Sequence, residues 1–105
     1  MEESQLLKGI LEACVLQIIA QKETYGYEIL TKLHNAGFQT ITEGTLYPIL
    51  TRLEKKNFII GRKAKSPLGP MRKYFRITPL GTSHLSSYIE IYKKTIQNAN
   101  AILLI

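Results

Sequence analysis

The sequence predicts a mainly helical domain with one small β-hairpin, and three observations lead to that fold class. Apolar residues recur at helical spacing in four segments, which is the main sequence signal for amphipathic helices. Two further segments, 58–65 and 71–78, are typical of strands and have a turn-rich stretch of proline and glycine between them. The chain has 105 residues, of which 45% are hydrophobic and 21% charged, so it can bury one core as a single globular domain.

The first helix is expected over residues 5–21. Its apolar residues cover about 220° of the helix circumference at 100° per residue, which is wider than one core-facing stripe. A helix with so much apolar surface in a small domain needs a second partner, such as another subunit. A second helix is expected over about 25–36, because the apolar pattern breaks near Gly26 and Gly37 is a typical C-terminal stop.

A third helix is expected to start near Thr42, which is a good N-cap residue. Ile41 before it is positioned to pack on Leu46 as a hydrophobic staple. Pro48 conflicts with a regular start, because a proline inside a helix loses a backbone hydrogen bond. The helix is therefore expected either to start as late as Gly44 or to bend at Pro48.

The last helix is expected to begin at Pro79, with Thr78 as its N-cap, because proline fits the first helical position. Apolar residues along it recur at alternating gaps of four and three, which is the spacing of a helix that pairs with another helix. This seam consists of Leu85, Ile89, Tyr92, Ile96, Ala99 and Leu103. We therefore expect a domain over residues 1–78 and a dimerisation helix over residues 79–105 that packs with the 5–21 helix as one compact unit.

Positive charge is concentrated in one part of the chain. Residues 52–76 contain nine Lys or Arg and a single Glu, whereas residues 1–51 contain six Glu and only three Lys. A basic segment within a mildly acidic chain is typical of a surface that binds a polyanion. A solvated basic face without any partner would have the same composition, so charge alone leaves both interpretations open.

Two short helices followed directly by a basic hairpin are the element order of a winged helix-turn-helix domain. In that arrangement the second helix of the pair enters the major groove of DNA, and the hairpin, or wing, contacts phosphates. The residues expected to contact DNA are Tyr25, Tyr27, Thr42, Thr45, Tyr47, Thr51, Arg52, Lys63, Lys65, Arg72, Lys73 and Arg76. Tyr27 could instead pack in the core, Tyr47 could instead be a half-buried core aromatic, and the wing cations could instead protect an exposed strand edge.

Three motifs together resemble the PadR family of bacterial transcriptional regulators: YGYEI at 25–29, EGTLYPILTRLE at 43–54 and RKYFRITPLG at 72–81. The resemblance covers about residues 6–85 and implies a dimeric winged helix-turn-helix repressor whose recognition helix contains the GTLYP stretch with Pro48. The single C-terminal helix resembles that of the short-tailed members, in which it pairs with the N-terminal helix of the partner. Some of these members are similar to multidrug sensors that bind flat aromatic cations or phenolic compounds between the subunits.

The apolar surface of the first helix and the seam of the last helix are expected to meet in a homodimer. On the first helix the expected interface residues are Leu7, Ile10 and Leu11, and on the last helix they are the six seam residues. A pocket for a small aromatic effector is expected between the subunits, lined by Leu7, Leu11, Val15, Tyr88 and Tyr92. The alternative is a dry interface in which the same surfaces close on each other.

Enzymes and metal proteins find little support in the sequence. The chain has one cysteine, Cys14, and no aspartate, so an internal disulfide cannot form and no metal-ligand spacing is present. No catalytic set, cofactor or metal is expected, and Cys14 is expected to be an inert buried thiol. The acidic N-terminus does not match a signal peptide and no apolar run is long enough to span a membrane, so we expect a cytoplasmic protein.

The sequence as a whole favours a dimeric, sequence-specific DNA-binding regulator that represses from a palindromic operator in double-stranded DNA and is released by a small molecule. The alternative is a winged-helix module that binds another protein without DNA. Such a module would not need so many cations in the hairpin segment, and its complex would depend far less on salt.

Overall fold

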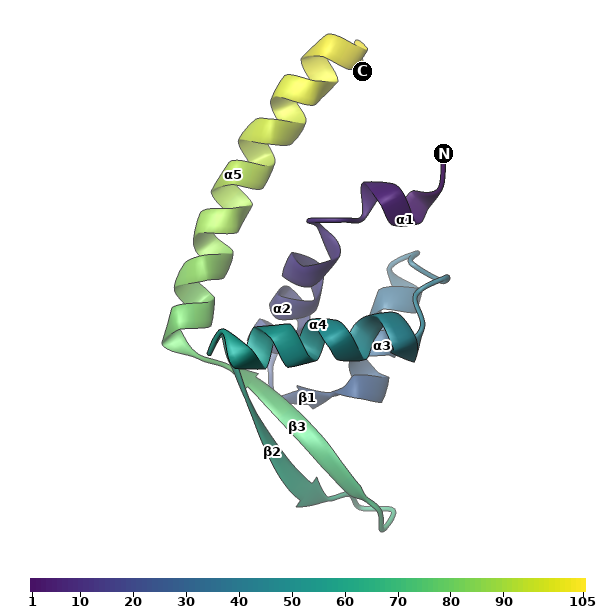
Figure 1. The fold of residues 1–105 in the computed structure, drawn as a ribbon, viewed down its shortest axis with the longest axis vertical. Coiled ribbons are helices and arrows are strands. Elements are labelled where there is room, and N and C mark those ends of the chain that lie inside the picture. Colours follow the sequence, from purple (N-terminus) through teal and green to yellow (C-terminus); the bar gives the residue numbers. More distant parts are fainter.

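The computed structural model describes residues 1–105 and consists of five helices and a small antiparallel sheet (Figure 1). The elements in chain order are α1 (Glu3–Leu6), α2 (Leu11–Gln21), β1 (Thr24–Tyr25), α3 (Gly26–Asn35), α4 (Glu43–Lys55), β2 (Ile59–Lys65), β3 (Met71–Ile77) and α5 (Pro79–Leu103). The strands pair in the order β1-β3-β2. The predicted fold class, mainly helical with a small sheet in a winged-helix arrangement, is confirmed. None of the helices combines the length and the apolar composition needed to cross a membrane.

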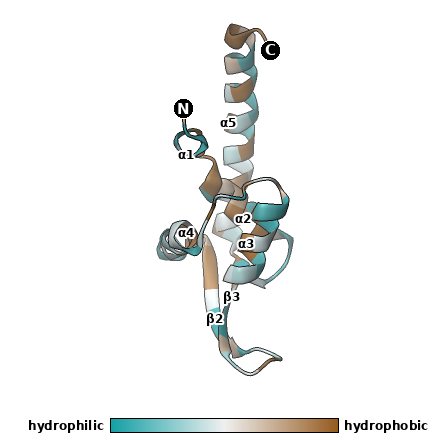
Figure 2. Ribbon diagram, turned by 90° about the vertical axis from the view of Figure 1, so that its right-hand side faces the viewer, coloured by the Kyte–Doolittle hydropathy of each residue, from teal (hydrophilic) through white to brown (hydrophobic).

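One apolar core holds α2, α3, α4 and the inner end of the sheet together. Fifteen buried apolar residues form a single cluster, in which Val15, Ile29 and Leu53 are completely enclosed. The hydrophobic colouring in Figure 2 follows this core along α2 and the inner end of β2, whereas the outer part of β2 is hydrophilic. α5 leaves the core in one direction and the hairpin in the other, so the domain is 52 Å long and only 20 Å thick (Figure 1).

The N-terminal region is broken where the sequence predicts one continuous helix over 5–21. α1 ends at Leu6, and Gly9 has a φ of +85°, a left-handed conformation that glycine adopts without steric cost. The hydroxyl of Tyr88 in α5 donates a hydrogen bond of 2.7 Å to the carbonyl of Gly9 and holds this break in place. The prediction of a single helix was wrong, because the helical spacing of apolar residues continues on both sides of a glycine that turns the chain.

The sheet contains one strand more than the predicted hairpin. β1 is only two residues long and pairs with residues 74–75 of β3. The two hairpin strands agree with the predicted 58–65 and 71–78 to within one residue at each end. α3 agrees equally well with the helix predicted over 25–36.

Both helix starts that were predicted from capping residues are confirmed in position. α4 begins directly after Thr42 and continues through Pro48, so it does not start late at Gly44. The Thr42 side chain makes no capping hydrogen bond. Thr78 does, because its hydroxyl oxygen accepts a 2.9 Å bond from the Gly81 amide and so anchors α5 at the end of β3.

Candidate DNA-binding surface and apolar groove

α4 presents a row of mostly small side chains to solvent. Its buried side consists of Leu46, Ile49, Leu50 and Leu53. At 100° per residue, the opposite side is a row of exposed residues, which we call the α4 row: Gly44, Pro48, Thr51 and Lys55. Because three of these residues are small, the backbone of α4 can approach another surface closely on this side. Lys55 was not among the predicted DNA contacts. Its helical spacing from Thr51, which was predicted, already indicates that the two residues share one side of the helix.

On one flank of this row, a depression of about 260 Å³ separates α4 from the start of α3 and from β3. Six of the predicted DNA contacts line it: Tyr25, Tyr27, Tyr47, Thr51, Arg72 and Lys73. Tyr27 is 68% exposed, so the alternative that it packs in the core is wrong. Tyr47 is 50% exposed, which fits the half-buried alternative as well as a DNA contact. Gly26 permits this arrangement, since a Cβ at that position would lie 3.0 Å from the Tyr47 hydroxyl oxygen.

On the other flank, ion pairs connect α4 to α2. Arg52 Nε lies 3.5 Å from Glu12 Oε2, and Lys56 Nζ lies 3.7 Å from Glu12 Oε1. Thr45 is exposed on this flank, beside a second depression of about 450 Å³ between α4 and the α1–α2 junction. Arg52, a predicted DNA contact, is therefore paired with Glu12 in the free protein, an interaction that the sequence did not indicate. Thr42 is exposed at the start of α4.

The cations of the wing are divided between the two faces of the hairpin. Side chains alternate along a strand, and residues paired across antiparallel strands share a face. Three lysines share the face whose inner end is buried against α4, and we call it the lysine face: Lys63, Lys65 and Lys73. Three arginines share the opposite, arginine face: Arg62, Arg72 and Arg76. The predicted wing contacts therefore do not form one continuous surface.

Two of the wing cations are ion-paired within the chain. Lys73 Nζ on the lysine face lies 2.8 Å from Glu54 Oε1 of α4. Arg62 donates from Nε and Nη2 to the two carboxylate oxygens of Glu23, at 2.8 and 2.6 Å. These hydrogen bonds from Arg62 hold the pKa of Glu23 below its usual value, and they raise the pKa of Arg62. The other two lysines of the lysine face have no acidic partner within 4.0 Å.

Tyrosines on the arginine face brace the wing against the body of the domain. Arg72 Cζ lies 4.3 Å from the centre of the Tyr25 ring. Arg62 Cζ lies 5.2 Å from the centre of the Tyr74 ring, and the two tyrosine rings meet edge to face at 5.5 Å. Each cation–π contact at such a partly exposed site contributes about 0.5–1 kcal/mol. Tyr25, a predicted DNA contact, is thereby half-buried and helps to set the angle of the hairpin.

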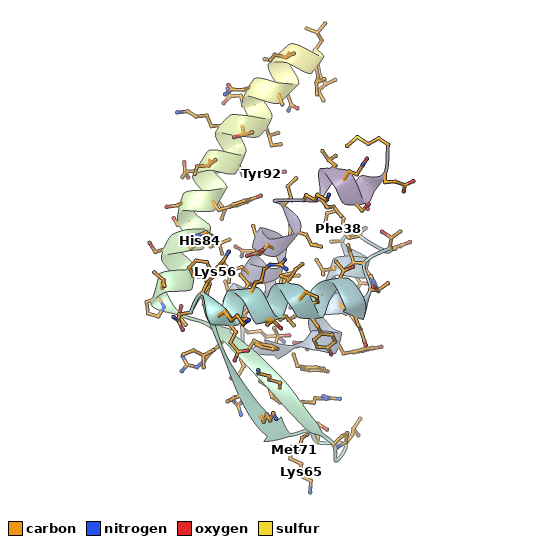
Figure 3. The ribbon with its side chains drawn as sticks, in the orientation of Figure 1. Phe38, Lys56, Lys65, Met71, His84 and Tyr92 are labelled. Carbon is orange, nitrogen blue, oxygen red and sulfur yellow. The ribbon has the colours of Figure 1, made fainter.

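A separate apolar groove of about 450 Å³ lies between α2, α3 and α5. Tyr88 and Tyr92, which were predicted to line a pocket between subunits, line this groove within one chain, with their rings stacked 6.0 Å apart. Figure 3 shows Tyr92 on the side of α5 that faces the domain. Ile10, Cys14 and Ile18 form its wall on α2. Burial raises the pKa of the Cys14 thiol and is also the main cause that raises the pKa of Tyr88.

The other residues of the predicted pocket between subunits, Leu7, Leu11 and Val15, are buried in the core of the chain instead. Their prediction was wrong because α2 is apolar on two sides, and the side that carries Leu11 and Val15 is the one that packs against the rest of the domain. Leu7 lies on the separate turn before Gly9 and is enclosed as well.

The seam of α5 is only partly covered within the chain. Leu85 joins the core, as do Leu7 and Leu11, so these three predicted interface residues are used inside the subunit. The other six remain at least partly accessible: Ile10, Ile89, Tyr92, Ile96, Ala99 and Leu103. The C-terminal half of α5 extends beyond the rest of the domain, as Figure 1 shows, so its apolar side chains have no partner in the same chain.

Comparison with known proteins identifies the fold and its family. Residues 15–87, from within α2 to the first part of α5, match the PadR-like family of transcriptional regulators. The chain belongs to this family. A Streptococcus transcriptional regulator of known crystal structure is 47% identical, with a TM-score of 0.84 and coverage of 93% of this chain and 96% of that one. A PadR-like transcriptional regulator from Bacillus cereus is 43% identical, with a TM-score of 0.85 and coverage of 94% and 96%.

The similarity of this PadR-like chain to its relatives includes the C-terminal helix. The two solved structures are matched over nearly their whole length, so they share α5 as well as the winged helix. A protein of Lysinibacillus sphaericus described as uncharacterized protein X is 40% identical over 93 residues, which are 86% of this chain and 84% of that protein. The GTLYP motif that resembles the PadR family lies in the first half of α4, where Gly44 and Pro48 belong to the α4 row.

Proposed function

We propose that the protein is a dimeric, sequence-specific DNA-binding repressor that a small molecule releases from its operator. The observation that carries the proposal is that the lysine face of the wing is the hairpin face that lies against α4, where Lys73 is paired with Glu54. The small side chains of the α4 row suit entry of α4 into the major groove, where Thr45 and Arg52 on its flank contact base edges. Lys63 and Lys65 on the wing then neutralise phosphates of the same duplex.

The tyrosine hydroxyls around the first depression suit a backbone contact next to the major groove. Tyr27 and Tyr47 are exposed at the start of α3 and on α4, on the flank that faces β3. A phenolic hydroxyl donates to a phosphate oxygen without adding charge, and such contacts orient a protein on the duplex. The two tyrosine–phosphate contacts would therefore fix the position of α4 along the base pairs.

The uncovered seam of α5 supports a homodimer. An apolar seam of this kind in water promotes association, and a two-fold pair covers it in both subunits. In a two-fold dimer the two α4 helices would lie roughly 34 Å apart, which matches half-sites of a palindromic operator one DNA turn apart. Each subunit alone would make half of the contacts and bind weakly.

The apolar groove supports release by a small molecule. Its volume of about 450 Å³ lies within the range of small-molecule sites, and Tyr88 and Tyr92 offer stacked aromatic rings to a planar compound. Ile89 and Tyr92 belong both to the groove and to the α5 seam. A compound in the groove would therefore alter the packing of the dimer and with it the spacing of the two α4 helices.

DNA selection followed by binding measurements at two salt concentrations tests the DNA part of the proposal. If the dimer makes about 6–10 phosphate contacts, affinity should fall roughly 10³–10⁵-fold between 50 and 200 mM salt. Lys65→Ala should lower the affinity for the selected duplex and for random duplex by the same factor. Thr45→Ala should instead reduce the ratio of the affinity for the selected duplex to that for random duplex. A binding partner whose affinity does not change with salt would instead favour a protein-interaction module.

The release part is tested with planar aromatic cations and phenols as probes. A compound that occupies the groove should lower affinity for the selected duplex and should also slow alkylation of Cys14, which lines the groove. Compounds that release DNA without protecting Cys14 would place the effector site elsewhere. A set of compounds that does neither would favour a dry dimer interface.

A further inference from the structure

Glu12 in the first turn of α2 lies between two cations of α4. Its oxygen Oε2 is 3.5 Å from Arg52 Nε, and its oxygen Oε1 is 3.7 Å from Lys56 Nζ. Figure 3 shows Lys56 at the C-terminal end of α4. The Glu12 side chain is 29% exposed, whereas the side chains of Arg52 and Lys56 are 53% and 55% exposed. Glu12 is therefore the most enclosed member of this group, and its carboxylate can position the two cations.

This group borders the depression in which base contacts are proposed. Arg52 follows Thr45 after two helical turns, so the two side chains lie on one side of α4. Glu12, Thr45 and Arg52 all line the depression of about 450 Å³ between α4 and the α1–α2 junction. A base edge or a phosphate that approaches Arg52 from this side therefore meets the Glu12 carboxylate as well.

The ion pair with Glu12 uses only part of the Arg52 guanidinium. Glu12 is closest to Nε, and most of the N–H donors of an arginine are on its two Nη atoms. By comparison, Glu23 accepts hydrogen bonds from both Nε and Nη2 of Arg62. Arg52 can therefore stay paired with Glu12 while its Nη groups donate to another acceptor. Suitable acceptors in the major groove are O6 and N7 of guanine, the pair of atoms that arginine contacts most often.

The negative charge of Glu12 changes which of these acceptors Arg52 favours. A guanine edge carries no formal charge, so it can share the guanidinium with a carboxylate. A phosphate is an anion, so Glu12 repels it, and it gains less from a guanidinium whose charge is already balanced. An arginine without such a partner would instead neutralise phosphates of any sequence. Repulsion of the wrong acceptor is a common source of specificity.

We propose that Glu12 sets the sequence specificity of the protein by directing Arg52 to a guanine edge and away from phosphates. Lys56 holds the carboxylate from its other side. Glu12 is a positioning residue, since it acts through Arg52 and need not touch the DNA. The inference rests on the proposed function, because it needs a duplex bound along α4. It adds a guanine to the expected operator, at the position that Arg52 reaches.

Glu12→Gln tests this role, because it removes the charge and keeps the size of the side chain. On random duplex, Arg52 of each subunit should then neutralise a phosphate, which steepens the slope of log affinity against log salt by about 1.8. On the selected duplex the slope should not change, since Arg52 stays at the guanine. The ratio of selected to random affinity should therefore fall about tenfold at about 50 mM salt and return close to the wild-type value at about 200 mM. An unchanged ratio at both salt concentrations overturns the proposal.

Glu54→Gln is the matched control, since Glu54 is a similarly exposed carboxylate that is paired with Lys73 of the wing. Release of Lys73 should raise the affinity for both duplexes by the same factor, so the ratio should keep its wild-type value. In the double variant Glu12→Gln/Arg52→Ala, the steeper slope on random duplex should be absent. A slope that stays steep in the double variant would show that Glu12 acts through the total charge of the protein, and it would overturn the role of Arg52.

A modified base tests the guanine contact without any change to Glu12. The base 7-deazaguanine has a C–H group in place of N7, so it keeps its pairing with cytosine and loses one acceptor in the major groove. The wild-type protein should bind a selected duplex with this base in both half-sites about tenfold more weakly, whereas Arg52→Ala should bind both duplexes equally. A wild-type protein that tolerates the modified base at every guanine of the selected duplex overturns the proposal.

Two further outcomes separate this inference from the proposed function. Wild-type protein that binds no duplex overturns both. Wild-type protein that selects a duplex, with the same selectivity in Glu12→Gln, overturns only the role of Glu12. Thermal denaturation is the control for folding, and Glu12→Gln should unfold close to the wild-type temperature because exposed ion pairs contribute little to stability. A lowered unfolding temperature with unchanged selectivity would assign Glu12 to the packing of α2 on α4 instead.

Discussion

Lys63 and Arg76 of the wing test most directly how the hairpin meets DNA. Both side chains are exposed, and neither has an acidic partner within 4.0 Å. They differ in the face that they occupy, since Lys63 is on the lysine face and Arg76 on the arginine face. A duplex bound along α4 can therefore place a phosphate beside Lys63, while Arg76 points away from it.

The size of the effect follows from counterion release. Each phosphate contact adds about 0.9 to the slope of log affinity against log salt concentration. A dimer has two copies of Lys63, so Lys63→Ala should reduce this slope by about 1.8. When salt rises from about 50 to 200 mM, the affinity of the variant should therefore fall by a factor roughly twelve times smaller than the factor for the wild type. Arg76→Ala should leave the slope unchanged, because its charge displaces no counterion from a bound phosphate.

Fluorescence anisotropy of a labelled duplex over this range of salt measures both slopes. Thermal denaturation provides the control for folding, and each variant should differ from the wild type by less than about 0.5 kcal/mol. Equal reductions of slope in the two variants would refute the reasoning, because the wing would then act through its total charge and not through one face. A reduction in Arg76→Ala alone would place the duplex on the arginine face.

Three further predictions concern the dimer, the sheet and the start of α3. Ile96→Glu puts a charge into the α5 seam and should give monomers by light scattering, whereas Ile91→Glu on the exposed side of α5 should remain dimeric. Glu23→Gln should lower stability at neutral pH, because it removes the bonds from Arg62. Those bonds lower the carboxyl pKa, so the advantage of the wild type should vanish in denaturation experiments as the pH falls through that lowered pKa. Gly26→Ala should weaken DNA binding by the dimer about 30-fold, equivalent to one hydrogen bond of about 1 kcal/mol in each subunit, because the new Cβ displaces the Tyr47 hydroxyl. An unchanged affinity there would show that this hydroxyl does not contact DNA.

Structure that depends on neighbouring residues could be predicted from the sequence. The starts of α4 and α5 were predicted from Thr42 and Thr78, because a helix start involves only a few consecutive residues, although only Thr78 makes the capping hydrogen bond. Strand alternation alone assigns Phe75 to the opposite face of β3 from Arg72 and Arg76, whatever the partner strand. The pairing of β2 with β3 was also accessible, since one short turn connects them.

Structure that depends on distant residues could not be predicted in the same way. Apolar spacing runs unbroken across Gly9, and the hydroxyl that holds the break belongs to Tyr88, 79 residues later in the chain. β1 is too short to show an alternating pattern of its own. α2 is apolar on two sides, so its sequence does not reveal which side faces the core and which lines the groove. That choice depends on where α3 and α5 pack against it.

Ion pairing leaves fewer free cations on the surface of the domain than the sequence suggests. Four of the nine cations between residues 52 and 76 are paired with glutamates: Arg52 and Lys56 with Glu12, Arg62 with Glu23, and Lys73 with Glu54. Exposed pairs of this kind contribute little to stability, so their larger effect is on the electrostatic field. They cancel charge on the flank toward α2, on part of the arginine face and, at Lys73, on the part of the lysine face next to α4. Lys55 on the α4 row and Lys63 and Lys65 on the lysine face remain unpaired, so a bound duplex would be attracted most strongly by these three side chains. Composition is compatible with a polyanionic partner, and the pairing of individual side chains then indicates which surface such a partner would contact.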